Sequence, residues 1–382
     1  MKEYKLSQLL EIKNGKDHKE LPNGDYPVFG SGGVMRYVNE YLYDKPSILL
    51  PRKGSLNNIQ YCDVPFWTVD TLYYTEVNEK IACPYYLYNY LCLLDLSGLD
   101  TGTGVPSMTF DSYYNIKVLL PEIEEQKRVA SVLQNLDHKI ALNRQINDNL
   151  EEMAKQLYDY WFVQFDFPNE EGKPYKSSGG AMVWNEKLKR EIPQGWSGVS
   201  LKDLAVTSRN AITPVENEVY QHFSIPSFDA CGSYSLDNGS DIKSDKFVLQ
   251  EGQLLVSKLN PWFNRVVWVP RGTNMIGSTE FVVLNPNNKS ESGYIYSVIK
   301  SPKFVAYCSQ AATGTSHSQR RVSPDVLMAF KVAYEPDVVQ KYGCFMENIQ
   351  KRQAELLSET ATLTKQRNEF LPLLMNGQIS IQ

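Results

Sequence analysis

Apolar side chains repeat with helical spacing in two long stretches of the chain. In the first stretch, intervals of four and three residues separate ten positions, eight of which are apolar. These positions are Val129, Leu133, Leu136, Ile140, Asn143, Asn147, Leu150, Ala154, Leu157 and Trp161. In the second stretch, Ile349, Leu356, Leu363 and Phe370 recur every seven residues. Both patterns predict a long helix with one apolar stripe.

Two such helices, far apart in one sequence, favour an antiparallel pair over a long parallel dimer. Asn143 and Asn147 would then fix the register, because a polar residue in an apolar seam penalises wrong alignments. The alternative is two amphipathic helices packed on separate domains, with both asparagines facing water. Pro121 and the glutamates that follow it mark the start of the first helix.

Short apolar or β-branched runs outside these stretches predict strands. They lie at 47–50, 71–75, 253–256, 265–269 and 280–284. Clusters rich in Gly and Asn, such as 30–33 and 285–288, predict the loops between them. The fold class is therefore mixed α/β, or α+β.

Five pairs of short segments match each other in the same order along the chain. They are 5–9 with 200–204, 47–53 with 253–258, 67–72 with 277–282, 101–104 with 313–316, and 115–118 with 329–332. Their offsets rise from 195 through about 206, 210 and 212 to 214, as small insertions would produce. We infer a diverged duplication. The predicted organisation is two similar globular domains, at 1–121 and 197–336, each followed by a helix, at 122–167 and 337–382, with a turn-rich linker at 168–196.

The net charge of the chain does not indicate a nucleic-acid-binding protein. The net charge is −5, and residues 1–120 carry 11 basic and 14 acidic side chains. Residues 195–336 are close to neutral, with 13 basic and 12 acidic side chains. If this chain binds DNA, its charges must be sorted onto one face, or a partner must supply phosphate contacts.

Cysteine usage and hydropathy limit the protein's location. The six cysteines form no CxxC pair and the chain has only four histidines, so we expect neither a zinc site nor a disulfide framework. No stretch approaches the ~20 apolar residues that span a bilayer, and the start lacks an apolar signal core. We expect a cytoplasmic protein with no membrane contact.

Several motifs, in this order, resemble the specificity subunits of type I restriction-modification systems. They are YPVFGSGG at 26–33, ILLPRKGSLNN at 48–58, PFWTVDT at 65–71, Leu120-Pro121 with Glu125-Gln126, LYDYWFV at 157–163 with Phe165-Asp166, GSTEF at 277–281 and LPLLMNG at 371–377. The resemblance covers nearly the whole chain. It implies two target-recognition domains, each reading one half of a split, asymmetric site in double-stranded DNA. It also implies that two long antiparallel coiled-coil helices separate them.

The resemblance further implies a set of partners. The helices would dock two methyltransferase subunits, which bring S-adenosylmethionine and methylate adenine, and a motor-nuclease subunit would join for restriction. This chain would bring no cofactor. Helix length gives an independent check, because the 33 residues from Val129 to Trp161 span ~50 Å, or roughly 14 base pairs. That length suits two half-sites with a spacer.

Candidate DNA contacts are loop segments that combine a cation with amides, hydroxyls or aromatic rings. Arg can bond guanine through two hydrogen bonds, Asn can do the same with adenine, and Lys can hold phosphate. The glycines could allow close approach to a phosphate or form a tight turn. For each residue the alternative is a solvated turn. The candidates are Gly30, Ser31, Gly32, Arg52, Lys53, Ser55, Asn57, Asn58, Thr103, Lys258, Asn260, Trp262, Asn264, Arg265, His317, Gln319, Arg320 and Arg321.

The sharpest alternative is a stand-alone DNA adenine methyltransferase. Asn260-Pro261-Trp262-Phe263 resembles the Asn/Asp-Pro-Pro-Tyr/Phe motif that holds a flipped base, but it lacks the second proline. No glycine-rich cofactor loop and no GK[ST] phosphate loop accompany it. Asp70 and Glu280 occupy matching repeat positions, which favours a shared structural or recognition role. We therefore predict a non-catalytic chain, and keep a structural scaffold that does not bind DNA as a further alternative.

Overall fold

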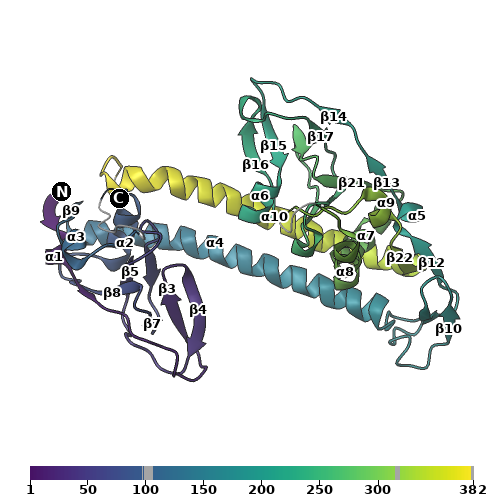
Figure 1. Cartoon of the computed structure of the whole chain (residues 1–382), viewed down its shortest axis with the longest axis horizontal. Coiled ribbons are helices and arrows are strands. Elements are labelled where there is room, and N and C mark those ends of the chain that lie inside the picture. Colours follow the sequence, from purple (N-terminus) through teal and green to yellow (C-terminus); the bar gives the residue numbers. More distant parts are fainter. Residues whose placement is uncertain (97, 99–105, 315–318, 380–382) are drawn as a thin grey trace. The chain divides into compact units, whose positions relative to one another are not determined.

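A computed structural model describes residues 1–96, 98, 106–314 and 319–379. Contacts divide the chain into two units, unit 1 with residues 1–142 and 360–382, and unit 2 with residues 143–359. Each unit therefore holds part of both long helices, α4 (Ile123–Tyr158) and α10 (Pro336–Met375). Figure 1 traces the elements along the chain.

Unit 1 contains the first copy of the repeat, built from short strands and three short helices in the described part. Its elements are β1 (Lys2–Lys5), α1 (Leu6–Leu9), β2 (Leu10–Lys13), β3 (Tyr26–Gly30), β4 (Gly33–Val38), β5 (Ser47–Pro51), β6 (Gln60–Cys62), β7 (Trp67–Thr68), β8 (Leu72–Val77), α2 (Pro84–Cys92), α3 (Phe110–Tyr114) and β9 (Lys117–Leu120).

Unit 2 contains the second copy, preceded by a short π-helix and a hairpin. Its elements are the π-helix η2 (Asp159–Val163), β10 (Met182–Asn185), β11 (Arg190–Pro193), β12 (Ser197–Ser200), α5 (Leu201–Leu204), β13 (Ala205–Ser208), β14 (Ala211–Ile212), β15 (Val219–Phe223), α6 (Ile225–Cys231), β16 (Ser235–Asn238), η3 (Gly239–Asp241), β17 (Lys246–Val248), β18 (Leu254–Ser257), η4 (Pro261–Phe263), β19 (Val266–Trp268), β20 (Met275–Gly277), β21 (Phe281–Pro286), η5 (Lys289–Glu291), α7 (Ser292–Lys300), α8 (Pro302–Ala311), α9 (Pro324–Met328) and β22 (Lys331–Tyr334).

In the described part of the chain, the two copies share the strand order of two sheets, whereas the third sheet has three strands in the first copy and five in the second. The order β2-β8-β5-β6 in the first copy is repeated as β13-β21-β18-β19 in the second, and β1-β9 is repeated as β12-β22. Each copy also has one parallel pair, β3 with β7 and β15 with β20. Even a helix cap repeats, since Thr109 caps α3 and Ser323 caps α9 through their side-chain oxygens. The predicted mixed fold with two similar copies and two long helices is confirmed.

The long helices run antiparallel within each unit. In unit 2, Asn143 donates to Glu359 at 2.8 Å, whereas Tyr342, earlier in α10, donates to the carbonyl oxygen of Ala154, later in α4. In unit 1, Arg367 pairs with Asp137 at 2.7 Å. The Asn143 side chain is buried in this seam rather than facing water. The predicted stripe of α10 is wrong at Phe370, which is exposed, because Leu371 and Leu374 are the buried residues of that turn.

The segment 168–196, predicted as a linker, packs into unit 2. Ile192 and Trp196 are buried in the same core as Trp161, Phe162 and Tyr342. Phe162 and Trp196 have ring centroids 5.8 Å apart. This segment therefore belongs to the core of the second copy, although its turn-rich composition is typical of a connector.

Candidate nucleic-acid interface

In the first copy, the loop after β5 pairs with the segment that leads into α3. The amide of Gly54 donates to the Pro106 carbonyl at 2.9 Å, and the amide of Met108 donates to the Arg52 carbonyl at 3.0 Å. Lys53 and Ser107 form the β-bridge between these two bonds. We name this junction J1, comprising residues 52–58 and 106–109. Two adjacent cations, Arg52 and Lys53, are thereby fixed on a short two-stranded platform.

The glycine-serine segment forms the tip of the β3-β4 hairpin and contacts J1. Gly33 has φ of +117°, which favours glycine in this tight turn. The Asn58 side chain donates to the Ser31 carbonyl at 2.5 Å, and Gln60 donates to the Gly30 carbonyl at 2.9 Å. The structure thus brings together the predicted residues Gly30, Ser31 and Asn58, with the exposed Gly32 at the tip.

A cavity of about 370 Å³ opens beside J1. Its lining includes Arg52 and Lys53, and also residues that the sequence analysis missed: Asn14, Tyr73, Ser107, Met108, Thr109 and Phe110. Burial raises the pKa of Tyr73, and the guanidinium of Arg52, 6.0 Å from its ring, opposes that rise. Tyr73 and Phe110 are ordinary core-type residues, so no local sequence signal distinguishes them.

The second copy repeats the same junction. The amide of Val322 donates to the Lys258 carbonyl at 3.1 Å, as Met108 does to Arg52 in J1. Leu259 and Arg321 form the bridge that corresponds to Lys53 and Ser107. We name this junction J2, comprising residues 258–265 and 319–323. Gln319 is exposed and Arg320 half-buried at its edge.

Asn260 ties the two segments of J2 together. Its amide donates to the Arg320 carbonyl at 2.7 Å, and its side-chain oxygen accepts from the Arg320 amide at 3.0 Å. In J1 the residue at this position is Gly54, and a different side chain holds the loop: the oxygen of Asn57 accepts from the Leu96 amide at 3.1 Å. Both asparagines therefore hold the loop, whereas Ser55 in J1 is exposed.

Three predicted contact residues of J2 bind the protein itself. Arg265 is 9% exposed and grips Asp229 through Nε and Nη2 at 2.6 and 2.7 Å, which lowers the pKa of that carboxyl. Arg321 forms a two-point ion pair with Glu280, which raises the pKa of Arg321. Asn264 donates to the Lys300 carbonyl at 3.0 Å. These contacts support roles in positioning J2.

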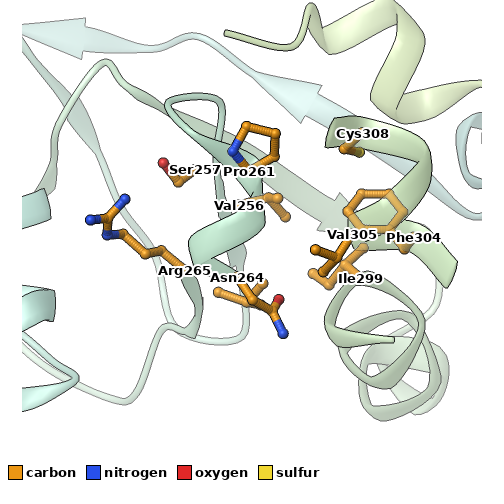
Figure 2. A pocket seen from close by; sticks show the side chains of 10 residues that line it. Val256, Ser257, Pro261, Asn264, Arg265, Ile299, Phe304, Val305 and Cys308 are labelled. Atoms are coloured by element: carbon orange, nitrogen blue, oxygen red, sulfur yellow. The ribbon is translucent and has the colours of Figure 1, made fainter. Parts of the chain in front are cut away.

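The pocket that Pro261 of the Asn260-Pro261-Trp262-Phe263 string lines is too small for a base. Figure 2 shows this enclosed pocket behind the string, lined by Pro261, Asn264, Arg265 and apolar residues from β18, α7 and α8. Its volume is about 10 Å³, which suffices for about one water molecule. A flipped adenine would not fit there, so this geometry gives no support to base extrusion at this string.

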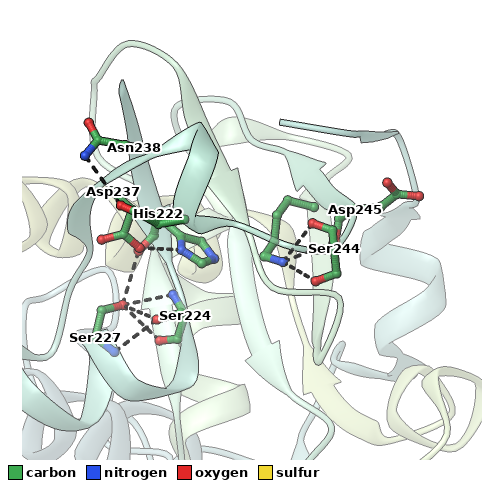
Figure 3. A network of polar contacts seen from close by, with 9 residues as sticks. His222, Ser224, Ser227, Asp237, Asn238, Ser244 and Asp245 are labelled. Carbon is green, nitrogen blue, oxygen red and sulfur yellow. Dashed lines mark hydrogen bonds and ion pairs between the residues drawn. The ribbon is translucent and has the colours of Figure 1, made fainter. Parts of the chain in front are cut away.

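A polar network lies in the five-stranded sheet of the second copy. His222 Nδ1 and Asp237 Oδ2 are 2.7 Å apart, and Ser224 and Ser227 bond each other just beyond (Figure 3). Lys246 is buried and donates to the Ser244 hydroxyl at 2.6 Å. Burial lowers the pKa of Lys246. The His222–Asp237 contact joins β15 to β16 and so stabilises the sheet, whereas the serine and lysine bonds fix local turns.

Some predictions fall outside the described residues, namely Thr103 and His317. Within the described ranges, no group of three or more His, Cys, Asp or Glu side chains is placed to hold a metal ion. Among the same residues, no helix is long and apolar enough to cross a membrane.

The proteins to which this chain is similar in sequence are specificity subunits of type I restriction enzymes. Residues 1–152 match the family model for the type I restriction modification DNA specificity domain. The chain is 21% identical over 393 residues to the type I restriction enzyme MjaIX specificity subunit of Methanocaldococcus jannaschii, covering 95% of this chain and 86% of that protein. It is 32% identical over 160 residues to the MjaVIII specificity subunit of the same organism, covering 41% of this chain and 32% of that protein.

A solved structure has the same fold. The S subunit of a type I restriction-modification system from M. genitalium matches with a TM-score of 0.62 at 15% sequence identity. The match covers 98% of this chain and 95% of that chain. This agreement extends over both copies and both long helices.

Proposed function

We propose that this chain is a type I restriction-modification specificity subunit that reads a bipartite, asymmetric DNA site for a methyltransferase complex. The match of residues 1–152 to the model of the DNA specificity domain and the similarity to the MjaIX specificity subunit support this proposal. Each copy reads one half-site, with 1–121 and 197–336 as the two target-recognition domains. The chain itself is non-catalytic and binds no cofactor. It works in the cytoplasm, where its partners and its DNA are.

The observation that carries this proposal is the repeated junction with diverged side chains. J1 and J2 have the same backbone pairing, and both begin with a cation, Arg52 or Lys258. A cation at an equivalent backbone position suits a phosphate contact, which positions the protein without reading sequence. The next residues differ, as Lys53 in J1 and Leu259 in J2 illustrate. Two different half-sites require loops at equivalent positions that carry different side chains, because each base pair is recognised by its own pattern of donors and acceptors.

The long helices serve as spacer and as docking surface for two methyltransferase subunits, which bind S-adenosylmethionine, and a motor-nuclease subunit joins for restriction. α4 has 36 residues and α10 has 40, so they extend ~54 Å and ~60 Å, or roughly 16 and 18 base pairs. Both carry exposed apolar side chains, among them Leu142, Met153 and Phe345. Contiguous exposed apolar patches mark protein contacts, and we propose that these side chains contribute to such a patch when the methyltransferase subunits dock.

Methylome mapping tests the proposal. Cells with the chain and its methyltransferase partner are expected to carry one split adenine motif, and cells lacking this chain are expected to lose it. Absence of any such motif would favour the scaffold that does not bind DNA. Methyl transfer to DNA by the purified chain alone, measured with a labelled methyl donor, would instead establish a stand-alone methyltransferase.

Exchange of residues 1–121 for those of a relative tests the modular part. One half of the motif should change while the other half and the spacer persist. A change in both halves would contradict independent reading by the two copies. The chain, at net charge −5, is expected to bind DNA weakly alone, so the methyltransferase complex is the proper sample for binding measurements.

Removal of one cation from either junction should weaken binding evenly across DNA sequences. For Arg52→Ala and Lys258→Ala, we expect the slope of log K against log salt to fall by about one, because each phosphate contact contributes about 0.9. Anisotropy titrations of the complex over a salt series measure that slope. The exposed Lys289 of η5, replaced by alanine, is the control and should leave the slope unchanged. An unchanged slope for both junction variants would show that neither cation contacts the DNA.

A further inference from the structure

The turn η4 within J2 is firmly anchored to the core of unit 2. Pro261 is buried and packs against α8, and Figure 2 shows it facing the side of the pocket lined by Phe304, Val305 and Cys308. Asn264 is bonded to the Lys300 carbonyl at 3.0 Å. The residual space behind the turn is about 10 Å³. The turn therefore has little room to shift inward.

The backbone on both sides of this turn is held in a sparsely populated conformation. Asn260 has φ of 48° and Asn264 has φ of 51°, so the three residues between them are flanked by left-handed asparagines. Asn tolerates this conformation better than most residues, and strained backbone of this kind gathers at functional sites. The bonds of Asn260 to Arg320 keep the first of these residues in place.

Two large aromatic side chains of this anchored turn are exposed to solvent. Trp262 is 40% exposed and Phe263 is 57% exposed, with ring centroids 6.0 Å apart. The Arg265 guanidinium lies 4.5 Å from the Phe263 ring centroid and is itself fixed by Asp229. Phe263 is thus held in position while more than half of its surface meets solvent.

The charges of J2 favour a polyanion as the occupant of this aromatic surface. Lys258 begins the same loop. The backbone of Arg320 is bonded to Asn260, so this second cation also lies beside the loop. Duplex DNA offers phosphates on its outside and flat, apolar base faces within. Proteins that kink DNA insert side chains of this kind between base steps, while nearby cations hold the backbone.

The first copy has no equivalent of this aromatic pair. Alignment of the two β-bridges, Lys53 with Leu259, places Leu56 and Asn57 at the positions of Trp262 and Phe263. Leu56 is buried, and Asn57 accepts a hydrogen bond from the Leu96 amide. The aromatic surface is therefore a property of the second copy alone.

We propose that Trp262 and Phe263 form a wedge that unstacks one base step in the half-site read by the second copy. This inference rests on the proposed function. The wedge makes recognition of that half-site depend on how easily its DNA deforms, in addition to hydrogen bonds to base edges. Pyrimidine–purine steps, which unstack most easily, are favoured at the insertion point.

The test uses the methyltransferase complex and duplexes with the motif mapped in methylated genomes. 2-Aminopurine replaces an adenine at successive positions of both half-sites. Apart from the target adenine that the methyltransferase extrudes in each half-site, 2-aminopurine fluorescence is expected to rise several-fold on binding at one step of the second half-site, and at no step of the first. Trp262→Leu should abolish the rise and weaken affinity roughly ten- to a hundredfold, since stacking on an aromatic ring contributes on that order. Trp262→Tyr should keep most of the fluorescence rise and most of the affinity.

Trp184 on β10 is the matched control, because it is 58% exposed but lies outside J2. Trp184→Leu should leave affinity and fluorescence unchanged, and thermal melting checks that each variant is folded. The wedge proposal is wrong if the parent complex shows no fluorescence rise while Trp262→Leu still loses affinity. The aromatic surface would then contact a protein or phosphates. Unaltered affinity would also overturn the wedge proposal. Failure of the proposed function is separate, since it appears as the absence of a motif.

Discussion

Arg367→Ala is expected to destabilise unit 1 by about 2–3 kcal/mol, because it breaks a charged network that joins three helices. Arg367 of α10 donates to Asp137 of α4 at 2.7 Å and to Asn89 of α2 at 3.0 Å. Tyr85 of α2 donates to the other oxygen of Asp137. Without the arginine, Asp137 remains two-thirds buried with only the tyrosine as partner. Hydrogen exchange of unit 1 peptides measures the effect, since the two units need not unfold together.

Lys365→Ala is the matched control for this prediction. Lys365 lies two residues earlier in α10 and forms a distant, exposed pair with Glu369 at 3.9 Å. Such surface pairs contribute little, so less than about 0.5 kcal/mol should be lost. Replacing both Arg367 and Asp137 by apolar residues of similar size should restore much of the stability, because no unpaired charge is then left. Equal effects of Arg367→Ala and Lys365→Ala would show that the network is energetically unimportant.

Periodicity and repetition predicted most of the architecture. The predicted strand 47–50 is observed at Ser47–Pro51, and the predicted strand 280–284 at Phe281–Pro286. These runs are predictable because each is buried in a sheet, so apolar residues occupy consecutive positions. The duplication was visible for the same reason, since both copies must bury equivalent strands in equivalent sheets.

The site was less predictable because pairing is decided by the fold. The sequence around Arg265 predicts a DNA contact, yet its partner Asp229 lies on α6, 36 residues earlier. Phe370 fits a heptad, yet Leu371 and Leu374 are the residues that face the core at that end of α10. In both cases the local pattern is compatible with two arrangements, and only packing of distant elements selects one.

Phe162→Ala is expected to cost unit 2 about 3–5 kcal/mol, the range for truncating a buried aromatic residue. Phe162 is 3% exposed. Its ring centroid lies 4.6 Å from that of Tyr294, 5.1 Å from Tyr342 and 5.8 Å from Trp196. These rings come from α7, from α10 and from the end of the 168–196 segment, so one truncation opens a cavity where all of them meet. Thermal and denaturant unfolding measure the loss.

Tyr160→Ala tests whether the effect belongs to the cavity or to the π-helical turn itself. Tyr160 is in the same turn η2 but is exposed, so its removal should cost less than about 1 kcal/mol. Phe162→Leu keeps part of the buried volume and should fall between the two. Because the cluster includes Trp196, loss of Phe162 should also expose the 168–196 segment to proteolysis and weaken binding at the second half-site. Similar losses for Tyr160→Ala and Phe162→Ala would show that the turn, rather than the aromatic packing, fixes the second copy.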